Sequence, residues 1–338
     1  MVKFGIVGLG RLGKIHAMNI ATNVPGAQLV AACSLDQNEL NYAKEELGVQ
    51  NLYTSYEEMV NSGEIDAVAI VSPSSFHLEQ IEVAMEAGLH VFCEKPIGLD
   101  VPSIEKLVPV IEKRSDQVFM LGFMRRYDES YQYAKEMLDA GQIGDLTVVR
   151  CYGIDPSSGM ESFVKFAKES PSGGIFADMS IHDIDLVRWF TGSEAKQVWA
   201  LGNNVAYKEL DEVGELETGA AMIQMADGTI AFLLAGRNAA HGYHVETELI
   251  GTKGTLLVAQ HPEKNLVTVL NEHGVVRPTS QNFPERFKQA FITEMKEFVS
   301  CIHEKRQPNI TAIDGLQATI VADACQASWK DGKLVIID

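Results

Sequence analysis

Short apolar runs alternate with amphipathic segments from residue 1 to about residue 123. The runs typical of buried strands are residues 2–7, 28–33, 67–71, 90–93 and 118–121, with a shorter one near Leu52. Segments with helical spacing of apolar residues cover 14–21, 37–47, 56–61 and 103–113. Ser55 and Glu58 give the third of these helices a capping-box signal. This alternation predicts a parallel sheet with helical crossover connections.

The pattern changes after Gly122. The expected helices are 130–140, 282–305 and 315–330, together with one that begins near Ala177. The expected strands are 146–152, 196–205, 217–226, 229–236, 244–250, 254–260, 264–271 and 334–337. Asp227-Gly228 between two of these strands is a strong hairpin signal. We therefore predict an α/β domain over residues 1–123 and an α+β domain over 124–338 with a large, open, mainly antiparallel sheet. An open sheet needs a cover, and the sheet of a second subunit would fit.

Composition narrows the class of partner. The 338 residues suit about two domains, and 46% apolar residues suffice for their cores. The formal charge of −18 opposes binding to nucleic acid or to an anionic membrane. We also expect no membrane span and no signal peptide. The five cysteines are widely spaced and odd in number, which argues against a disulfide framework or a zinc ribbon and favours the reducing cytoplasm.

A glycine motif follows the first strand directly. The sequence Gly8-Leu9-Gly10-Arg11-Leu12-Gly13 leads from the strand into a helix. In this context Gly8 allows a tight turn, Gly10 lets the backbone approach a pyrophosphate, and Gly13 lets the helix pack closely on the strand. The helix start, with Arg11 and Leu12, would hold the pyrophosphate. The motif predicts a Rossmann dinucleotide-binding domain, with a plain glycine-rich turn as the alternative.

The residue that holds the adenosine ribose normally ends the second strand of such a domain. Here the chain reads Cys33-Ser34-Leu35-Asp36, so Ser34 takes the place of the usual carboxylate and Asp36 follows two residues later. Serine would not repel the 2′-phosphate of NADP. However, Arg11 is the only nearby cation that would attract it. We expect NAD as the cofactor, with NADP as the less favoured choice.

Two further turns follow strands of this sheet. Ser72, Pro73 and His77 come after the strand 67–71, where a turn faces the ligand crevice and contacts a cofactor. The alternative for His77 is a solvated histidine in the first turn of a helix. The strand 90–93 runs into Glu94-Lys95-Pro96, and the proline, by restricting Lys95 or through a cis bond, fixes the direction of this lysine. We expect Glu94 and Lys95 to contact the cofactor, with a surface lysine as the alternative.

The stretch from Gly173 to Asp185 places two acids and a histidine at helical spacing. In a helix that begins near Ala177, Asp178, His182 and Asp185 lie at i, i+4 and i+7 on one face. The remaining faces are largely apolar, so we expect the helix to be packed inside a domain. A carboxylate beside an imidazole in partly dry surroundings suits proton transfer. One alternative is an ordinary ion pair, and another is a metal site. Because no cluster of Cys or His elsewhere in the sequence would complete the metal ligands, we expect no metal.

Three of these motifs occur together in a known family. The sequence resembles the Gfo/Idh/MocA oxidoreductases over its whole length in Gly8-Leu9-Gly10-Arg11-Leu12-Gly13, in Glu94-Lys95-Pro96, and in the later Gly-Gly pair followed by Asp178, His182 and Asp185. The stretch 122–128 is most similar to the inositol 2-dehydrogenase branch. The resemblance implies oxidation of myo-inositol at C2 to the 2-keto product, scyllo-inosose, with hydride passing to NAD⁺. It also implies a homo-oligomer, a tetramer.

The resemblance further implies roles for individual residues. Lys95, Asp178 and His182 match the catalytic triad and also contact substrate. Arg125 matches a polyol contact, Asp155 falls where relatives use an asparagine, and His241 falls near another substrate contact. We expect His182 to take the hydroxyl proton, Asp178 to orient it and Lys95 to hydrogen-bond the reacting oxygen. The alternatives are a relative that acts on scyllo-inositol or an aldose, and a non-catalytic nicotinamide-sensing regulator, which would be expected to lose triad residues.

Overall fold

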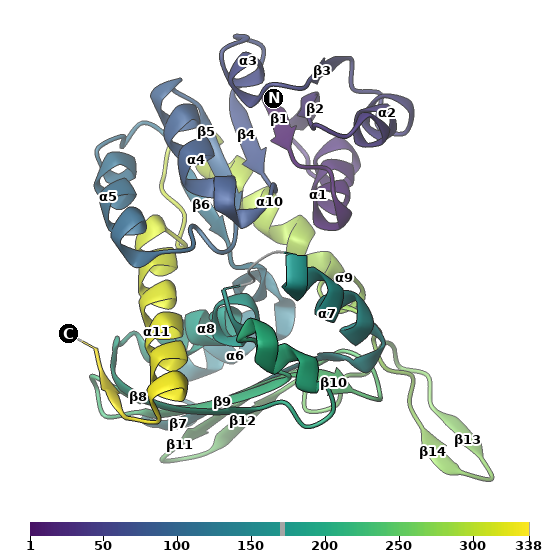
Figure 1. Cartoon of the computed structure of the whole chain (residues 1–338). Helices are drawn as coiled ribbons and strands as arrows, with labels where there is room; N and C mark the ends of the chain where they lie inside the picture. Colours follow the sequence, from purple (N-terminus) through teal and green to yellow (C-terminus); the bar gives the residue numbers. More distant parts are fainter. Residues whose placement is uncertain (170–172, 338) are drawn as a thin grey trace. The chain divides into compact units, whose positions relative to one another are not determined.

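The computed structural model describes residues 1–169 and 173–337, and it divides into two compact units (Figure 1). The first unit comprises residues 1–127 and 289–316, and the second comprises 128–288 and 317–338. A division at residue 123 therefore differs from the observed one, because residues 289–316 return to the first unit. No helix in the described ranges combines the length and apolar character needed to cross a membrane.

The first unit contains a six-stranded parallel sheet, which confirms the predicted α/β architecture. The strand order is β3-β2-β1-β4-β5-β6. The strands are β1 Val2–Val7, β2 Ala27–Cys33, β3 Asn51–Tyr53, β4 Ala67–Ile70, β5 His90–Glu94 and β6 Phe119–Gly122. This is the Rossmann order, in which the chain changes direction across the sheet between β1 and β4. The carboxyl ends of these strands are therefore where a dinucleotide is expected to bind.

Helices cover both faces of this sheet. They are α1 Arg11–Thr22, α2 Gln37–Glu45, α3 Tyr56–Val60, α4 His77–Glu86, α5 Val101–Glu112 and α10 Lys288–Glu304. The predicted cap of α3 is present, since Ser55 Oγ accepts a hydrogen bond from the Glu58 amide at 3.2 Å. Helix α10 contributes Phe298, whose ring centroid lies 5.9 Å from that of Phe4 and 6.0 Å from that of Phe92. These buried rings explain why α10 joins the first unit.

The second unit is built on a seven-stranded, mainly antiparallel sheet, as predicted. Its order is β12-β11-β7-β10-β9-β8-β15, and only β7 and β10 run parallel among the described pairs. The strands are β7 Leu146–Pro156, β8 Ala195–Asn203, β9 Thr218–Met225, β10 Ile230–Ala239, β11 His244–Gly251, β12 Thr255–Val258 and β15 Val335–Ile336. The strand expected at 264–271 is wrong as a member of this sheet. Only β13 Val269–Asn271 forms there, and it pairs with β14 Gly274–Val276 in a separate hairpin.

The helices of the second unit lie on one side of its sheet (Figure 1). They are α6 Glu129–Asp139, α7 Met160–Glu169, α8 Ile181–Thr191, the short α9 Phe283–Arg286, and α11 Ala312–Asp331 from residue 317 onward. Helix α8 packs on β7 and β10, and its residues 181–188 are all buried. The expectation that this helix is packed inside a domain is therefore confirmed. Helix α7 was not predicted.

Candidate active site

The glycine turn of the first unit has the shape that a pyrophosphate requires. Gly8 has φ +84°, and a Cβ there would lie 2.6 Å from the Val71 carbonyl oxygen. A Cβ on Gly13 would lie 2.0 Å from the Gly8 oxygen, whereas one on Gly10 would meet nothing nearer than Glu39 Oε1 at 4.0 Å. Packing therefore demands glycine at positions 8 and 13, while the space over Gly10 is open. This cradle, at the start of α1 with Arg11 and Leu12, fits a dinucleotide phosphate.

A carboxylate that the sequence pattern missed lies beside this cradle. Glu39, in the first turn of α2, accepts a hydrogen bond from Ser34 Oγ at 2.6 Å and one from the Leu9 amide at 3.3 Å, both at Oε2. Asp36 is used elsewhere, since its side chain caps α2 at the Asn38 amide. Glu39 thus brings an acid to the end of β2, where Ser34 alone was expected. The sequence feature that could have indicated Glu39 is an acidic residue in the first helical turn after an N-cap. Such residues are common in helices and do not by themselves indicate a binding site.

His77 ties two turns at the carboxyl edge of the sheet together. Its Nδ1 lies 2.7 Å from the Pro96 oxygen and its Nε2 lies 2.9 Å from the Ser72 oxygen. The ring is buried, and burial lowers the pKa of His77, so in the neutral ring one nitrogen donates to one of these carbonyls. The alternative of a solvated histidine is therefore wrong. The turn of Ser72 and Pro73 is joined to the Lys95–Pro96 turn through this ring.

Lys95 lies on a turn whose backbone is hydrogen-bonded to the buried side chain of Glu94. The Lys95–Pro96 peptide is cis, and the Lys95 amide donates to Glu94 Oε2 at 3.1 Å. Glu94 Oε1 in turn lies 2.7 Å from His16 Nε2. Lys95 itself is half-buried, and it directly follows the carboxyl end of β5. Lys95 is thus placed at the same edge of the sheet as the glycine turn and His77.

Arg125 follows the last strand of this sheet. It lies in the turn Met124–Tyr127 directly after β6 and is 3% exposed. The next residue, Arg126, donates to the Asn309 oxygen at 3.2 Å and to Asp314 Oδ1 at 3.0 Å. The arginine pair is therefore anchored through Arg126 at the carboxyl end of β6.

In the second unit, the residues before α8 do not form the regular α-helix that the spacing predicted. Phe176–Ser180 is a π-helical turn, and α8 begins only at Ile181. The wider π turn changes the angular offset between Asp178 and His182, so the expected regular α-helix from Ala177 is wrong over this turn, while the shared face of these two residues stays a prediction. A sequence spacing does not reveal a π turn, but such turns are frequent at functional sites.

Asp178 is held by an arginine that sequence analysis did not single out. Arg237 Nη2, from β10, donates to Asp178 Oδ2 at 2.8 Å. The same guanidinium lies 3.6 Å from the ring centroid of Phe163, and Arg237 is buried. A buried arginine at the end of a strand requires a counter-ion, which was the signal available. Asp178 is therefore paired with a fixed cation, and the absence of a metal stays a prediction.

The other expected substrate residues of this unit come from the sheet and from α8. His182 is buried on α8, and so is Asp185, which the sequence singled out only by its helical spacing. Asp155 lies near the carboxyl end of β7, between β10 and β11, at the end where the turn with His241 connects these two strands.

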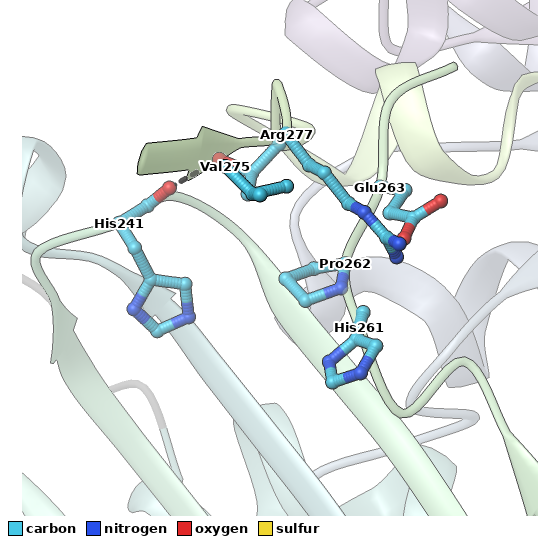
Figure 2. A pocket seen from close by; sticks show the side chains of 7 residues that line it. His241, His261, Pro262, Glu263, Val275 and Arg277 are labelled. Atoms are coloured by element: carbon cyan, nitrogen blue, oxygen red, sulfur yellow. Dashed lines mark hydrogen bonds and ion pairs between the residues drawn. The ribbon is translucent and has the colours of Figure 1, made fainter. Parts of the chain in front are cut away.

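His241 lines a cavity of about 390 Å³ (Figure 2). The lining residues are His241, His261, Pro262, Glu263, Val275, Arg277 and Thr279. Arg277 and Glu263 form an ion pair within it, and His241 Nε2 lies 3.0 Å from His244 Nδ1. None of Asp155, Asp178 and His182 is in this lining.

Comparison with known proteins gives matches over both units. Residues 2–123 match the model described as the oxidoreductase family with an NAD-binding Rossmann fold, and residues 131–257 match the GFO/IDH/MocA C-terminal domain. The first match confirms the expected NAD-binding domain.

Similar proteins extend over the whole chain. The scyllo-inositol dehydrogenase of Lactobacillus casei, solved with bound NAD(H) and scyllo-inositol, is 60% identical with a TM-score of 0.98, covering 99% of each chain. The myo-inositol 2-dehydrogenase of Lactobacillus plantarum is 51% identical with a TM-score of 0.97, covering 100% of this chain and 99% of that one. The scyllo-inositol 2-dehydrogenase (NAD(+)) of Bacillus subtilis (strain 168) is 32% identical over 100% of this chain and 96% of its own length.

Proposed function

The chain belongs to the Gfo/Idh/MocA oxidoreductase family, and we propose that it oxidises one hydroxyl group of an inositol to a ketone with NAD⁺. The observation that carries this proposal is Lys95, a lysine fixed at the carboxyl end of β5 at the edge that bears the glycine cradle. Relatives named for inositol oxidation, at up to 60% identity among those described above, supply the substrate class.

The reaction needs a base for the hydroxyl proton and a donor for the oxygen on which charge develops. In this proposal His182 takes the proton, and Asp178, paired with Arg237, balances the charge of the resulting imidazolium. Lys95 hydrogen-bonds the reacting oxygen. NAD⁺, when bound, accepts the hydride that leaves the ring carbon.

The remaining expected residues orient the two ligands. Gly8, Gly10, Arg11 and Leu12 would hold the pyrophosphate, and Ser34 with Glu39 would hold the adenosine ribose. Arg125, Asp155 and His241 would bind the other ring hydroxyls. For Arg125 and Asp155 this is supported by their places at strand ends. His241 is the least supported member of the set, because it lines a cavity whose lining includes none of Asp155, Asp178 and His182.

Two stereoisomers are candidates for the substrate. The sequence resemblance implies myo-inositol, oxidised at C2, whereas the 60% identical relative is named for scyllo-inositol. These isomers differ only in the configuration at C2, so oxidation there gives the same ketone, scyllo-inosose. The similarity favours scyllo-inositol as a second candidate for the preferred substrate. The reverse reaction, reduction of scyllo-inosose by NADH, decides between them. NMR analysis of the product shows scyllo-inositol if the new hydroxyl group is equatorial and myo-inositol if it is axial.

An absorbance assay of nicotinamide reduction tests the proposed function. The panel contains myo-inositol, scyllo-inositol and several aldoses, each with NAD⁺ and with NADP⁺. We expect turnover with an inositol and NAD⁺. Binding of NAD without turnover of any inositol or aldose would instead support a nicotinamide-sensing regulator. Turnover of an aldose but of no inositol would show that the substrate is a sugar.

We also propose that the protein is a cytosolic homo-oligomer. A tetramer is the state that the resemblance to the family implies. The cytosolic placement is supported by five free, buried cysteines. The oligomer is supported by the open face of the second unit's sheet, where Trp199, Met222 and Phe232 are neighbours across β8, β9 and β10 and are 46%, 43% and 41% exposed. A contiguous apolar face of this kind indicates a protein interface.

A further inference from the structure

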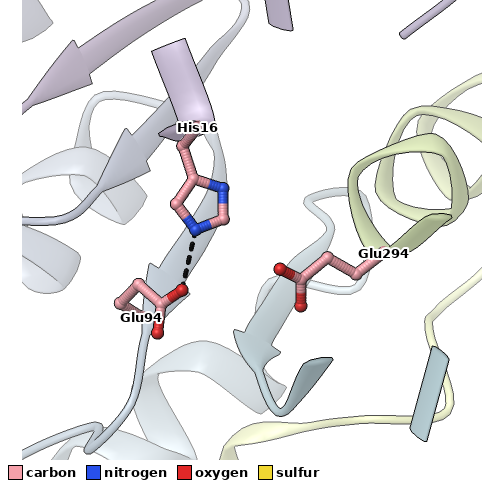
Figure 3. Close-up of side chains that lie close together, drawn as sticks. All are labelled: His16, Glu94 and Glu294. Atoms are coloured by element: carbon pink, nitrogen blue, oxygen red, sulfur yellow. Dashed lines mark hydrogen bonds and ion pairs between the residues drawn. The ribbon is translucent and has the colours of Figure 1, made fainter. Parts of the chain in front are cut away.

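Three ionisable side chains from three elements meet inside the first unit (Figure 3). They are His16 from α1, Glu94 from the end of β5 and Glu294 from α10, which are 0%, 5% and 0% exposed. One ligand atom of each lies within 4.8 Å of the others. The proposed mechanism uses neither His16 nor Glu294.

The two carboxylates of this cluster have unequal surroundings. The Lys95 amide donates to Glu94 Oε2 at 3.1 Å, and His16 Nε2, which lies 2.7 Å from Oε1, donates to it in the tautomer that carries the proton on this nitrogen. Neither oxygen of Glu294 has a hydrogen-bond partner among the described residues. Two carboxylates this close in a dry interior do not both ionise, and donors favour the charged form. Glu94 therefore holds the negative charge. Consistently, burial and the charge of Glu94 raise the pKa of Glu294 well above its ordinary range.

His16 is fixed in the orientation that serves Glu94. Its ring lies 5.2 Å from the ring of Phe92 and 5.5 Å from the ring of Phe291, measured between centroids. Rotating the imidazole away from Glu94 would disturb both contacts. The 2.7 Å separation from Glu94 also argues against a shared metal ion, because two ligands of a tetrahedral zinc lie roughly 3.3 Å apart.

We propose that Glu94 is a positioning residue for Lys95, that His16 orients the Glu94 carboxylate, and that Glu294 is a neutral acid which leaves this anchor with a single negative charge. The carboxylate joins the helix that follows the glycine turn to the backbone of the turn that carries Lys95. This inference rests on the proposed role of Lys95 in inositol oxidation.

Two identical substitutions within the cluster test it. Glu94→Gln replaces one carboxylate oxygen with an amide N–H₂ and removes the charge, so the Lys95 amide loses its hydrogen bond to a charged acceptor. We expect kcat to fall about 10- to 100-fold. The Kd for NAD should change little, because the buried Glu94 oxygens contact His16 and the Lys95 amide, which speaks against the direct cofactor contact expected from the sequence. Glu294→Gln keeps a neutral group of the same shape, and we expect kcat to stay within about 2-fold of wild type. Equal losses in the two variants, or stoichiometric zinc in the purified wild type, would overturn the proposal.

A second pair keeps the test decisive if Glu94→Gln does not fold. The amide nitrogen of a glutamine at position 16 reaches the place of the imidazole Nε2, so His16→Gln should retain most of the turnover. His16→Leu has no such donor, and its kcat should fall about as much as that of Glu94→Gln. Thermal unfolding establishes which variants fold. Similar turnover in folded His16→Gln and His16→Leu would contradict the role of His16.

A double-mutant cycle separates this inference from the proposed function. If Glu94 acts through Lys95, Glu94→Gln should have no further effect on turnover in a Lys95→Met background. Undiminished turnover in Lys95→Met, or a wild type inactive on inositols, would instead refute the proposed function. Positioning is then decided by the rate of reductive methylation of Lys95, measured by mass spectrometry. Glu94→Gln should change this rate and Glu294→Gln should not, and unchanged rates in both would overturn the inference.

Discussion

Arg237 donates a hydrogen bond to Asp178 at 2.8 Å, across 59 residues of sequence. The carboxylate that we assign to charge balance at His182 therefore has a buried cation as its partner. Because this guanidinium also packs on Phe163, its position is fixed by shape as well as by charge.

Replacing Arg237 should impair turnover more than folding. Arg237→Met leaves Asp178 without its fixed partner, and we expect kcat to fall about 10-fold or more, the cost of one hydrogen bond between charged groups. Arg237→Lys keeps the positive charge but loses the planar guanidinium, so its kcat should lie between those of wild type and Arg237→Met. Steady-state kinetics with a thermal melt of each variant measures this. Wild-type kcat in folded Arg237→Met would show that Asp178 does not depend on Arg237.

Glu39 should decide between NAD and NADP. Its carboxylate, beside Ser34 and the Leu9 amide, is placed to accept a ribose hydroxyl and to repel a 2′-phosphate. We expect Glu39→Gln to weaken NAD binding by about 1.5–3 kcal/mol, roughly 10- to 100-fold in Kd, and to raise the NADP/NAD ratio of kcat/KM. Glu45→Gln, on an exposed position of the same helix, is the matched control. Equal cofactor ratios in the two variants would remove this role from Glu39.

Glu294 should make the protein less stable as pH rises. Burial raises the pKa of Glu294, so the folded chain keeps a proton that the unfolded chain releases above about pH 4.3. Its stabilising contribution is present below that pH and is lost as pH rises toward the raised pKa. His16, Glu94 and Tyr127 are the titratable groups that act with it. The Tm difference between Glu294→Gln and wild type should therefore grow in favour of the variant with rising pH.

Glu297, three residues after Glu294 on α10, provides a control with the opposite pH dependence. Arg306 lowers the pKa of Glu297, so its contribution is present above the ordinary pKa and is lost as pH falls. Glu297→Gln should be less stable than wild type near neutral pH, and this difference should shrink toward acid. The same pH trend in both variants would refute the protonation states assigned to these two acids.

The open sheet face should mediate self-association. Trp199→Glu places a charge beside Met222, which in turn neighbours Phe232, and this charge would be costly to bury in an interface. We expect a lower molar mass by light scattering at the same protein concentration. Tyr133→Glu, at an exposed aromatic position on α6, should leave the mass unchanged. A wild type that is already monomeric would contradict the interface.

The sequence pattern was sufficient for the two sheets but not for contacts between distant elements. Buried parallel strands are continuous apolar runs separated by helices, so the Rossmann order and the place of Lys95 at the end of β5 were predictable. Amphipathic alternation likewise predicted β9 and β10. The separate hairpin of β13 and β14 was missed, because its strands are exposed and pair only with each other.

The site residues divide in the same way. Ser34 was placed correctly at the end of β2, but Glu39 reaches it from the next helix, and local spacing contains no information on that reach. The π turn at Phe176–Ser180 has no periodic signature, so a regular α-helix was the natural expectation. The Arg237–Asp178 pair and the approach of Glu294 to Glu94 depend on tertiary packing between segments far apart in sequence.

The central claim is that His182 and Lys95 perform the proton and oxyanion chemistry of inositol oxidation. The most direct test measures NADH formation from scyllo-inositol and myo-inositol by wild type, His182→Ala and Lys95→Ala, together with the Kd for NAD of each. We predict that wild type turns over at least one of the two inositols. Each variant should lose about 10²- to 10⁴-fold in kcat while still binding NAD. Near wild-type turnover in either variant, or no turnover of any inositol by the wild type, would contradict the account.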